Sequence, residues 1–118
     1  MRFMLMHYSN EENEADVPPS PEQMAAIGEY MEESVRSGVL LAGEGVRSSR
    51  HGARVTVDGG KVTVTDGPFA EAKELIAGFA ILDVKSKDEA IEHAKRWAQV
   101  SGATKIDVRR VAEFSDFE

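Results

Sequence analysis

An acidic side chain stands at a rigid corner of the chain, in the run Asp66-Gly67-Pro68-Phe69. Gly67 can adopt backbone angles closed to other residues, and Pro68 fixes its own φ while keeping Gly67 away from helical geometry. The carboxylate of Asp66 can therefore be held in a defined direction. Two roles fit it: a cap on backbone N–H groups of the turn, or a general base that projects into a cleft. The question for the structure is whether Asp66 caps or catalyses.

Two histidines are the other candidates for acid–base chemistry. His7 continues an apolar row at the end of the first predicted strand, where an imidazole can face the interior or the mouth of a cleft. A lone histidine in such a place is more often a hydrogen-bonded core residue than a catalyst. His51 lies in a basic loop and could meet a ligand near Asp66, although a loop position usually means exposure to solvent. The predicted catalytic set is therefore Asp66, His7 and His51; no histidine pair has metal-ligand spacing, so we predict no metal site.

Cationic and aromatic residues near the Asp66 corner suit an anionic or aromatic ligand. Guanidinium groups pair well with a carboxylate or a phenolate, and an aromatic ring can line an apolar pocket. More often such a basic run is simply solvated or pairs with nearby acid. The predicted substrate-binding residues are Arg47, Arg50, Arg54, Phe69 and Lys73.

Length and composition limit the classes of protein to consider. The 118 residues are enough for a single domain, 1–118, with 42% hydrophobic and 30% charged residues. A net charge of −7 opposes binding to nucleic acid or to an anionic membrane. No apolar run approaches the roughly 20 residues of a spanning helix. The absence of cysteine excludes disulfides and thiolate chemistry and favours the cytoplasm, and we expect no cofactor.

Hydrophobic periodicity and turn signals divide the chain into alternating strands and helices. Ser20 followed by Pro21, and Ser86 followed three residues later by Glu89, predict two helix starts. The run Asp58-Gly59-Gly60 between two alternating segments predicts a β-hairpin. The expected elements are strand 2–8, loop 9–19, helix 21–37, strand 39–46, hairpin strands 54–57 and 61–65, strand 78–84, a helix between Ser86 and Gly102, and strand 104–111.

Without the hairpin, the predicted order is strand, helix, strand, strand, helix, strand. This α+β order is the ferredoxin-like split βαβ arrangement, with the hairpin inserted at its midpoint. Two helices cover only one face of a four-stranded sheet, yet the first and third strands are apolar on both faces. We therefore expect a homodimer packed sheet to sheet about a two-fold axis. The alternative is a monomer in which loops and the hairpin cover that face.

The chain resembles the DGPF branch of the YCII-related family along most of its length. The matching motifs follow in the family's order, which makes them specific together. They comprise the opening strand, Ser20-Pro21-Glu22, Gly38-Val39-Leu40, Gly43-Glu44-Gly45, Arg54-Val55, the run 65–71 around Asp66, Lys73-Glu74, and Gly78-Phe79.

This resemblance implies a dimeric α/β barrel in which two ferredoxin-like sheets face one another. It also implies a small-molecule-binding protein or a cofactor-independent lyase, because the few assigned members include a dehydrochlorinase-like activity on a hydroxylated, chlorinated aromatic ring. Proton transfer or elimination on a small aromatic or anionic substrate is the corresponding expectation.

One element of the family pattern is missing here. Related YCII proteins are thought to use a histidine–aspartate pair with the histidine near the start of the first helix, and residues 21–27 contain none. Only the aspartate carries over, onto Asp66, so a pair would have to recruit His7 or His51. The missing histidine supports a second hypothesis, a non-enzymatic accessory or regulatory protein acting through protein contacts. Genes of this branch often neighbour those of alternative sigma factors, which suggests a regulatory setting.

Overall fold

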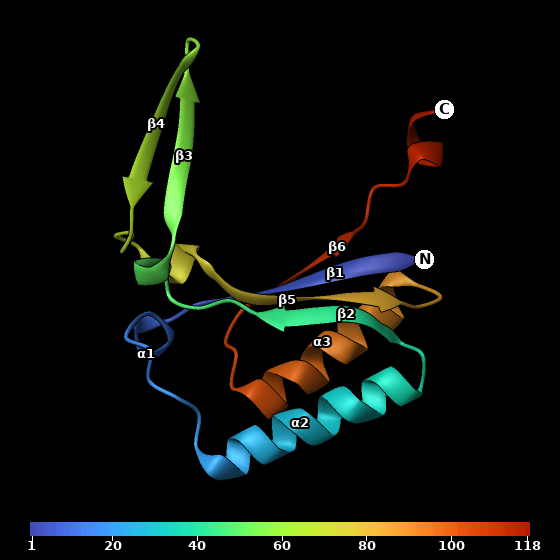
Figure 1. Ribbon diagram of the computed structural model, residues 1–118. Coiled ribbons are helices and arrows are strands. Elements are labelled where there is room, and N and C mark those ends of the chain that lie inside the picture. The colour runs from blue at the N-terminus through green and yellow to red at the C-terminus, as the bar shows by residue number, and fades with distance from the viewer.

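The computed structural model describes residues 1–118 as a four-stranded sheet with two long helices on one face and a separate two-stranded hairpin (Figure 1). No helix is both long and apolar enough to cross a bilayer. Short 3₁₀ helices occupy Ser49–His51, Ala72–Glu74 and Phe114–Phe117. The strands and α-helices are β1 (Arg2–Tyr8), α1 (Glu11–Glu14), α2 (Pro21–Arg36), β2 (Leu40–Gly45), β3 (Ala53–Asp58), β4 (Lys61–Asp66), β5 (Ile76–Asp83), α3 (Lys87–Ser101) and β6 (Ile106–Arg110).

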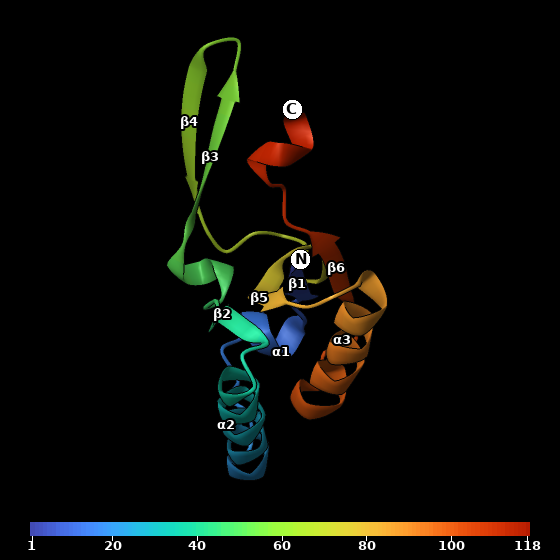
Figure 2. The same cartoon turned by 90° about the vertical axis from the view of Figure 1, so that its right-hand side faces the viewer.

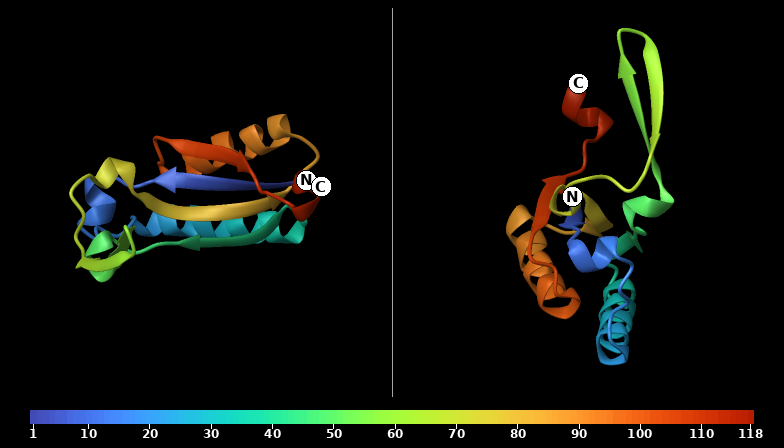
Figure 3. Two further views of the ribbon diagram at one scale, coloured as in Figure 1. Left: turned by 90° about the horizontal axis from the view of Figure 1, so that it is seen from above. Right: turned by 90° about the vertical axis from the view of Figure 1, so that its left-hand side faces the viewer.

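The large sheet has the strand order β2-β5-β1-β6, and every neighbouring pair is antiparallel. This is the ferredoxin-like arrangement that the sequence predicts, with β3 and β4 inserted between β2 and β5 and forming a sheet of their own. In the view from above, the four strands lie side by side with the helices behind them (Figure 3). The predicted fold class is therefore confirmed.

Both long helices begin where the sequence predicts. The hydroxyl of Ser20 accepts a hydrogen bond from the Gln23 N–H at 3.1 Å, and that of Ser86 accepts one from the Glu89 N–H at 3.2 Å. Each serine thereby satisfies one of the backbone donors that a helix start leaves unpaired. At the end of α3, Gly102 has φ 76°, a left-handed conformation that glycine adopts readily.

The core lies between the sheet and the helices. Phe3, Leu5 and Leu82 point toward the helices, and all three are 4% exposed. They pack with Val84 and with small residues of α3 in one cluster. The opposite face carries Met4, Met6, Phe79 and Ile81, and no helix covers it.

The hairpin and the C-terminal segment both project from the side of the sheet opposite the helices (Figure 2). The four-stranded face between them is open, so the hairpin does not cover it as the monomer alternative supposed. The hairpin turn is tighter than expected: Asp58 pairs with Lys61, which leaves only Gly59 and Gly60 in the turn, at φ 56° and 84°. Two successive residues with positive φ favour glycine at both positions.

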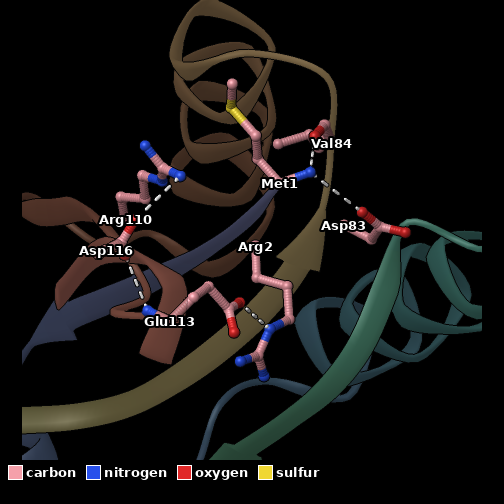
Figure 4. A network of polar contacts seen from close by, with 7 residues as sticks. All are labelled: Met1, Arg2, Asp83, Val84, Arg110, Glu113 and Asp116. Atoms are coloured by element: carbon pink, nitrogen blue, oxygen red, sulfur yellow. Dashed lines mark hydrogen bonds and ion pairs between the residues drawn. The ribbon is translucent and has the colours of Figure 1, made fainter. Parts of the chain in front are cut away.

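Polar contacts near the chain ends hold the C-terminal segment in place (Figure 4). The Nε of Arg2 donates to Glu113 at 2.8 Å, and the Glu113 N–H donates to Asp116 at 2.8 Å. The terminal amine of Met1 donates to the Val84 carbonyl at 2.9 Å. The acidic C-terminal tail is therefore partly tied to β1.

A second local difference concerns loop 9–19. Its first part forms the one-turn helix α1, because the side chain of Asn10 accepts a hydrogen bond from the Asn13 N–H at 2.8 Å. Asp16 follows at φ 59°, a left-handed conformation that aspartate tolerates better than most residues. This turn brings the acidic segment against the loop that follows β2, as described below.

Candidate functional site

A pocket of about 400 Å³ lies between α2, α3 and the helix-facing side of the sheet. Its walls are mainly apolar and aromatic, since the inner rows of the two helices and of β1 and β2 meet there without closing completely. The principal wall residues are Leu5, Ile27, Tyr30, Met31, Leu40 and Trp97. Tyr30 and Trp97 form an aromatic pair with ring centroids 5.6 Å apart. A volume of several hundred cubic ångströms with apolar walls is typical of small-molecule sites.

His7 stands at one end of this pocket in a fixed orientation. The indole Nε1–H of Trp97 donates to Nδ1 of His7 at 3.1 Å, and the two ring centroids are 5.8 Å apart. Gly78 lies opposite His7 in the neighbouring strand β5. A Cβ at Gly78 would stand 2.6 Å from Cε1 of His7, so the imidazole occupies the space that any other residue would fill.

The contact with Trp97 determines which nitrogen of His7 carries the proton. An indole N–H can only donate, so Nδ1 must accept and the proton of the neutral ring sits on Nε2. Burial lowers the pKa of His7 below its ordinary value of 6.5, which favours this neutral form. Nε2 has no hydrogen-bond partner in the protein. Every buried side-chain nitrogen or oxygen does have a partner, so Nε2 is not buried. Nε2 is therefore an accessible donor where His7 lines the pocket.

A second, polar hollow of about 230 Å³ adjoins the first. The two share His7, Asn13, Pro19 and Ser101, so His7 stands where the apolar pocket meets a polar entrance formed by residues 10–20. Apart from His7, the ionisable residues on these walls are Glu12, Glu44 and the two tyrosines, with no lysine or arginine. Glu44 lies opposite Phe79 in the sheet, so its side chain is on the face away from the helices. This composition disfavours an anionic ligand.

The residues predicted around Asp66 meet elsewhere, at the base of the hairpin. Arg47, His51 and Phe69 line a more open hollow of about 330 Å³. Nε2 of His51 lies 3.0 Å from Oδ2 of Asp16. The hydrogen bond from His51 is the main reason why the pKa of Asp16 lies below its ordinary value.

Hydrogen bonds from Ser49 complete the base of the hairpin. Its backbone N–H donates to Glu14 at 2.8 Å, and its hydroxyl accepts from the Phe69 N–H at 2.9 Å. The side chains of α1, the loop after β2 and the Asp66 corner are thereby linked. A histidine–aspartate pair is present in the chain, but it joins His51 to Asp16 rather than to Asp66.

Asp66 itself is exposed at the end of β4, and no hydrogen bond reaches its carboxylate. It does not cap the turn, because the turn is held by backbone: the Gly67 N–H donates to the Gly52 carbonyl at 3.0 Å. The guanidinium carbon of Arg54 lies 4.1 Å from the centre of the Phe69 ring. Arg50 and Lys73 are exposed and line none of the three hollows described here.

The predicted catalytic residues therefore lie in separate places. His7 faces the helix–sheet pocket, His51 lies at the base of the hairpin, and Asp66 ends a hairpin strand. No group of three or more histidine, aspartate or glutamate side chains is arranged to hold a metal ion. Tyr30 and Trp97 were not predicted as site residues. Trp97 is half-buried, and its contact with His7 spans 90 positions of sequence.

Comparison with known proteins identifies the family. The model of the YCII-related domain matches residues 1–115. The chain belongs to the YCII-related family. It is also similar to an uncharacterised protein of Rhizobium meliloti (strain 1021), with 38% identity over 70 residues. That alignment covers 58% of this chain and 52% of the relative, so it spans about half the length of that protein.

In this YCII-related protein, the contact between His7 and Trp97 should depend on pH. His7 has a lowered pKa when folded, so the unfolded chain binds the proton more readily. The contact therefore contributes fully above about pH 6.5, and its contribution is lost as the pH falls toward the lower pKa of the folded state. Protonation places a hydrogen on Nδ1, which can no longer accept from the indole.

The measurement is the indole N–H resonance of Trp97, the only tryptophan, followed from pH 8 to pH 4. We expect a single titration with a midpoint below 6.5, and we expect His7→Gln to abolish it. A titration that persists in His7→Gln would contradict this assignment. His93→Gln is the control, because His93 lies on α3 and touches Arg96 rather than Trp97.

Proposed function

We propose that this protein binds a small, neutral, mainly apolar molecule that carries a hydrogen-bond acceptor, in the pocket between α2, α3 and the sheet. The observation that supports this function is the position of His7: a neutral imidazole with its Nε2–H free, at the polar end of an apolar and aromatic cavity of about 400 Å³. A ligand oxygen bound to Nε2 would orient the molecule, and its apolar part would contact Tyr30 and Trp97.

The charges at the entrance indicate a neutral rather than an anionic ligand. Glu12 at the entrance would repel a carboxylate or phenolate, and no arginine lines the pocket to offset it. Arg47, Arg50 and Arg54 lie around the hairpin instead. The hydroxylated aromatic compounds suggested by the family resemblance fit this proposal in their neutral form.

Binding fits the geometry better than proton abstraction does. A general base must accept a proton, and Nε2 of His7 already carries one as long as Trp97 donates to Nδ1. His7 would instead polarise an acceptor oxygen of the ligand. A lyase reaction would need a separate base, and neither Asp66 nor His51 lines this pocket.

Three aromatic fragments of similar size test the proposal: acetophenone, ethylbenzene and benzoate. Acetophenone has a neutral acceptor, ethylbenzene has none, and benzoate adds a negative charge. We expect acetophenone to bind most tightly, with shifts of the Trp97 indole resonance and of Tyr30 in two-dimensional NMR titrations. His7→Phe should weaken acetophenone about 2- to 12-fold, the worth of one hydrogen bond, without weakening ethylbenzene.

His93→Phe makes the same substitution on α3 at a residue that does not line the pocket, and it should leave all three affinities unchanged. The proposal fails if none of the fragments perturbs Trp97. It also fails if His7→Phe weakens acetophenone and ethylbenzene equally, since His7 would then act through packing alone.

Three finer expectations from the sequence belong to the same proposal. Assignment to the DGPF branch is supported by the run 65–71 around Asp66 and by Gly78-Phe79. Action in the cytoplasm is supported by the absence of cysteine. The alternative role of a regulatory protein acting through protein contacts is supported by the lack of a histidine in residues 21–27.

A further inference from the structure

One face of the β3–β4 hairpin carries four valines, with Ala53 and Asp66 at its base, and the other face is polar. Val55 pairs with Val64 and Val57 with Val62, and directly opposed residues share a face. Each of these valines is between 61% and 67% exposed. The reverse face carries threonines together with Arg54, Asp58 and Lys61. A hairpin with solvent on both faces gains no stability from separating its apolar and polar residues in this way.

The hairpin has no partner within its own chain. It stands away from the four-stranded sheet in perpendicular views (Figures 1 and 2). A two-stranded hairpin alone is only marginally stable in water and needs a third strand or a packing surface. The one-sided valine pattern therefore indicates that the valines pack against a surface that a single copy of the chain does not supply.

The exposed area of the chain indicates how large this missing surface is. One copy exposes 8322 Å², whereas a folded monomer of 12.9 kDa exposes about 6,300 Å². Its radius of gyration is 16.1 Å, against about 13.5 Å for a compact domain of this length. The excess of roughly 2,000 Å² per copy lies in the range that obligate dimers bury.

We propose that the valine face of each hairpin packs against a second copy of this chain, as an arm that embraces it in a two-fold dimer. The surface available on that copy is the open sheet face with Met4, Met6, Phe79 and Ile81, which no helix covers. Because every copy carries both an arm and an open sheet, two copies related by a two-fold axis can each embrace the other, and the assembly then closes at two chains. The hairpin rises on the same side as the open face, where a second sheet would approach.

Opposed charge pairs on the two faces of the same hairpin provide a matched test. Val57→Lys/Val62→Glu places an ion pair on the valine face, and Thr56→Lys/Thr63→Glu places the same pair at the neighbouring opposed positions of the polar face. Light scattering across a dilution series gives the dimer dissociation constant. We expect the valine-face variant to raise it on the order of 100-fold, because the charges would have to leave water, and the polar-face variant to leave it within about threefold.

Cysteine accessibility provides a second readout that leaves the interface nearly intact. The chain contains no cysteine, so Val57→Cys and Thr56→Cys each introduce a single thiol. In an isolated copy both positions are exposed and should react alike with a thiol reagent. In the embraced dimer, Val57→Cys should react at least about tenfold more slowly than Thr56→Cys, and dilution below the dissociation constant should abolish the difference.

A wild-type monomer at micromolar concentration would overturn the proposal. Equal effects of the two charge pairs, or equal thiol reactivity in a dimer, would show that the arm does not take part. Protection of Val57→Cys in a monomer would show that the hairpin folds back on its own chain, which also contradicts the proposal.

Discussion

Replacing Gly67 by alanine should open the base of the hairpin and lower the free energy of unfolding by about 1–3 kcal/mol. A Cβ at Gly67 would overlap the carbonyl oxygen and carbon of Ser49, which are backbone atoms and cannot rotate away. The added methyl group must push apart the Asp66 corner and the loop after β2. The hydrogen bond from the Phe69 N–H to the Ser49 hydroxyl should break at the same time. Urea unfolding and the backbone amide shifts of Ser49 and Phe69 measure the two effects.

Gly52→Ala is the matched control, because it adds a methyl group near the same carbonyl of Ser49. There the Cβ would lie at 3.7 Å, an ordinary contact, and φ is −126°, a value open to any residue. We expect Gly52→Ala to be neutral or stabilising by up to about 1 kcal/mol, since alanine restricts the unfolded chain. Equal losses in the two variants would contradict the role of the Gly67–Ser49 contact.

Replacing Leu82 by alanine should destabilise the protein by about 2–5 kcal/mol. Leu82 is 4% exposed and belongs to the hydrophobic core. This core is small, since only 10 of the 118 residues are buried. It packs with Phe3, Leu5 and Val84, and removing its branched end leaves a cavity that the rigid strand pair β1–β5 cannot close. A loss of this size is a large part of the 5–15 kcal/mol that typically stabilises a domain.

Leu41→Ala makes the identical substitution at a leucine that is 53% exposed in β2. We expect it to cost less than about 1 kcal/mol, because little apolar surface returns to water. The unfolding of both variants should be measured at the same protein concentration, since dimerisation would make the midpoint of the unfolding transition depend on concentration. Comparable losses at the two leucines would mean that Leu41 is buried in the assembled protein.

The regular elements could be predicted from the sequence because their signals are local. Ser20 and Ser86 mark the helix starts, and the Gly59-Gly60 turn marks the hairpin. The boundaries came within about two residues, and the order of the elements predicted the sheet topology. The one-turn helix α1 was missed, since it depends on a single cap from Asn10 in an acidic run with no apolar periodicity.

The site was harder to predict because its contacts join distant parts of the chain. In the most unusual run, Asp66-Gly67-Pro68-Phe69, the sequence predicted a role for the carboxylate of Asp66. The structure places that acid in solvent, and it explains Gly67 by the close approach of Ser49. His7 was among the candidates, but its partner Trp97 is 90 positions away in the sequence. No spacing rule links a residue at the end of the first strand to one on the last helix.

The sequence by itself determined the fold class, the helix limits and the two-sided apolar character of β1 and β5, because these follow from periodicity, capping and turn residues within short windows. Only the tertiary structure decided which histidine meets which partner, that the helices leave a pocket at His7, and that the hairpin stands apart with its valines exposed. The reason is physical: hydrogen-bond partners, cavities and uncovered faces arise where elements pack in three dimensions, and packing depends on residues that are far apart along the chain.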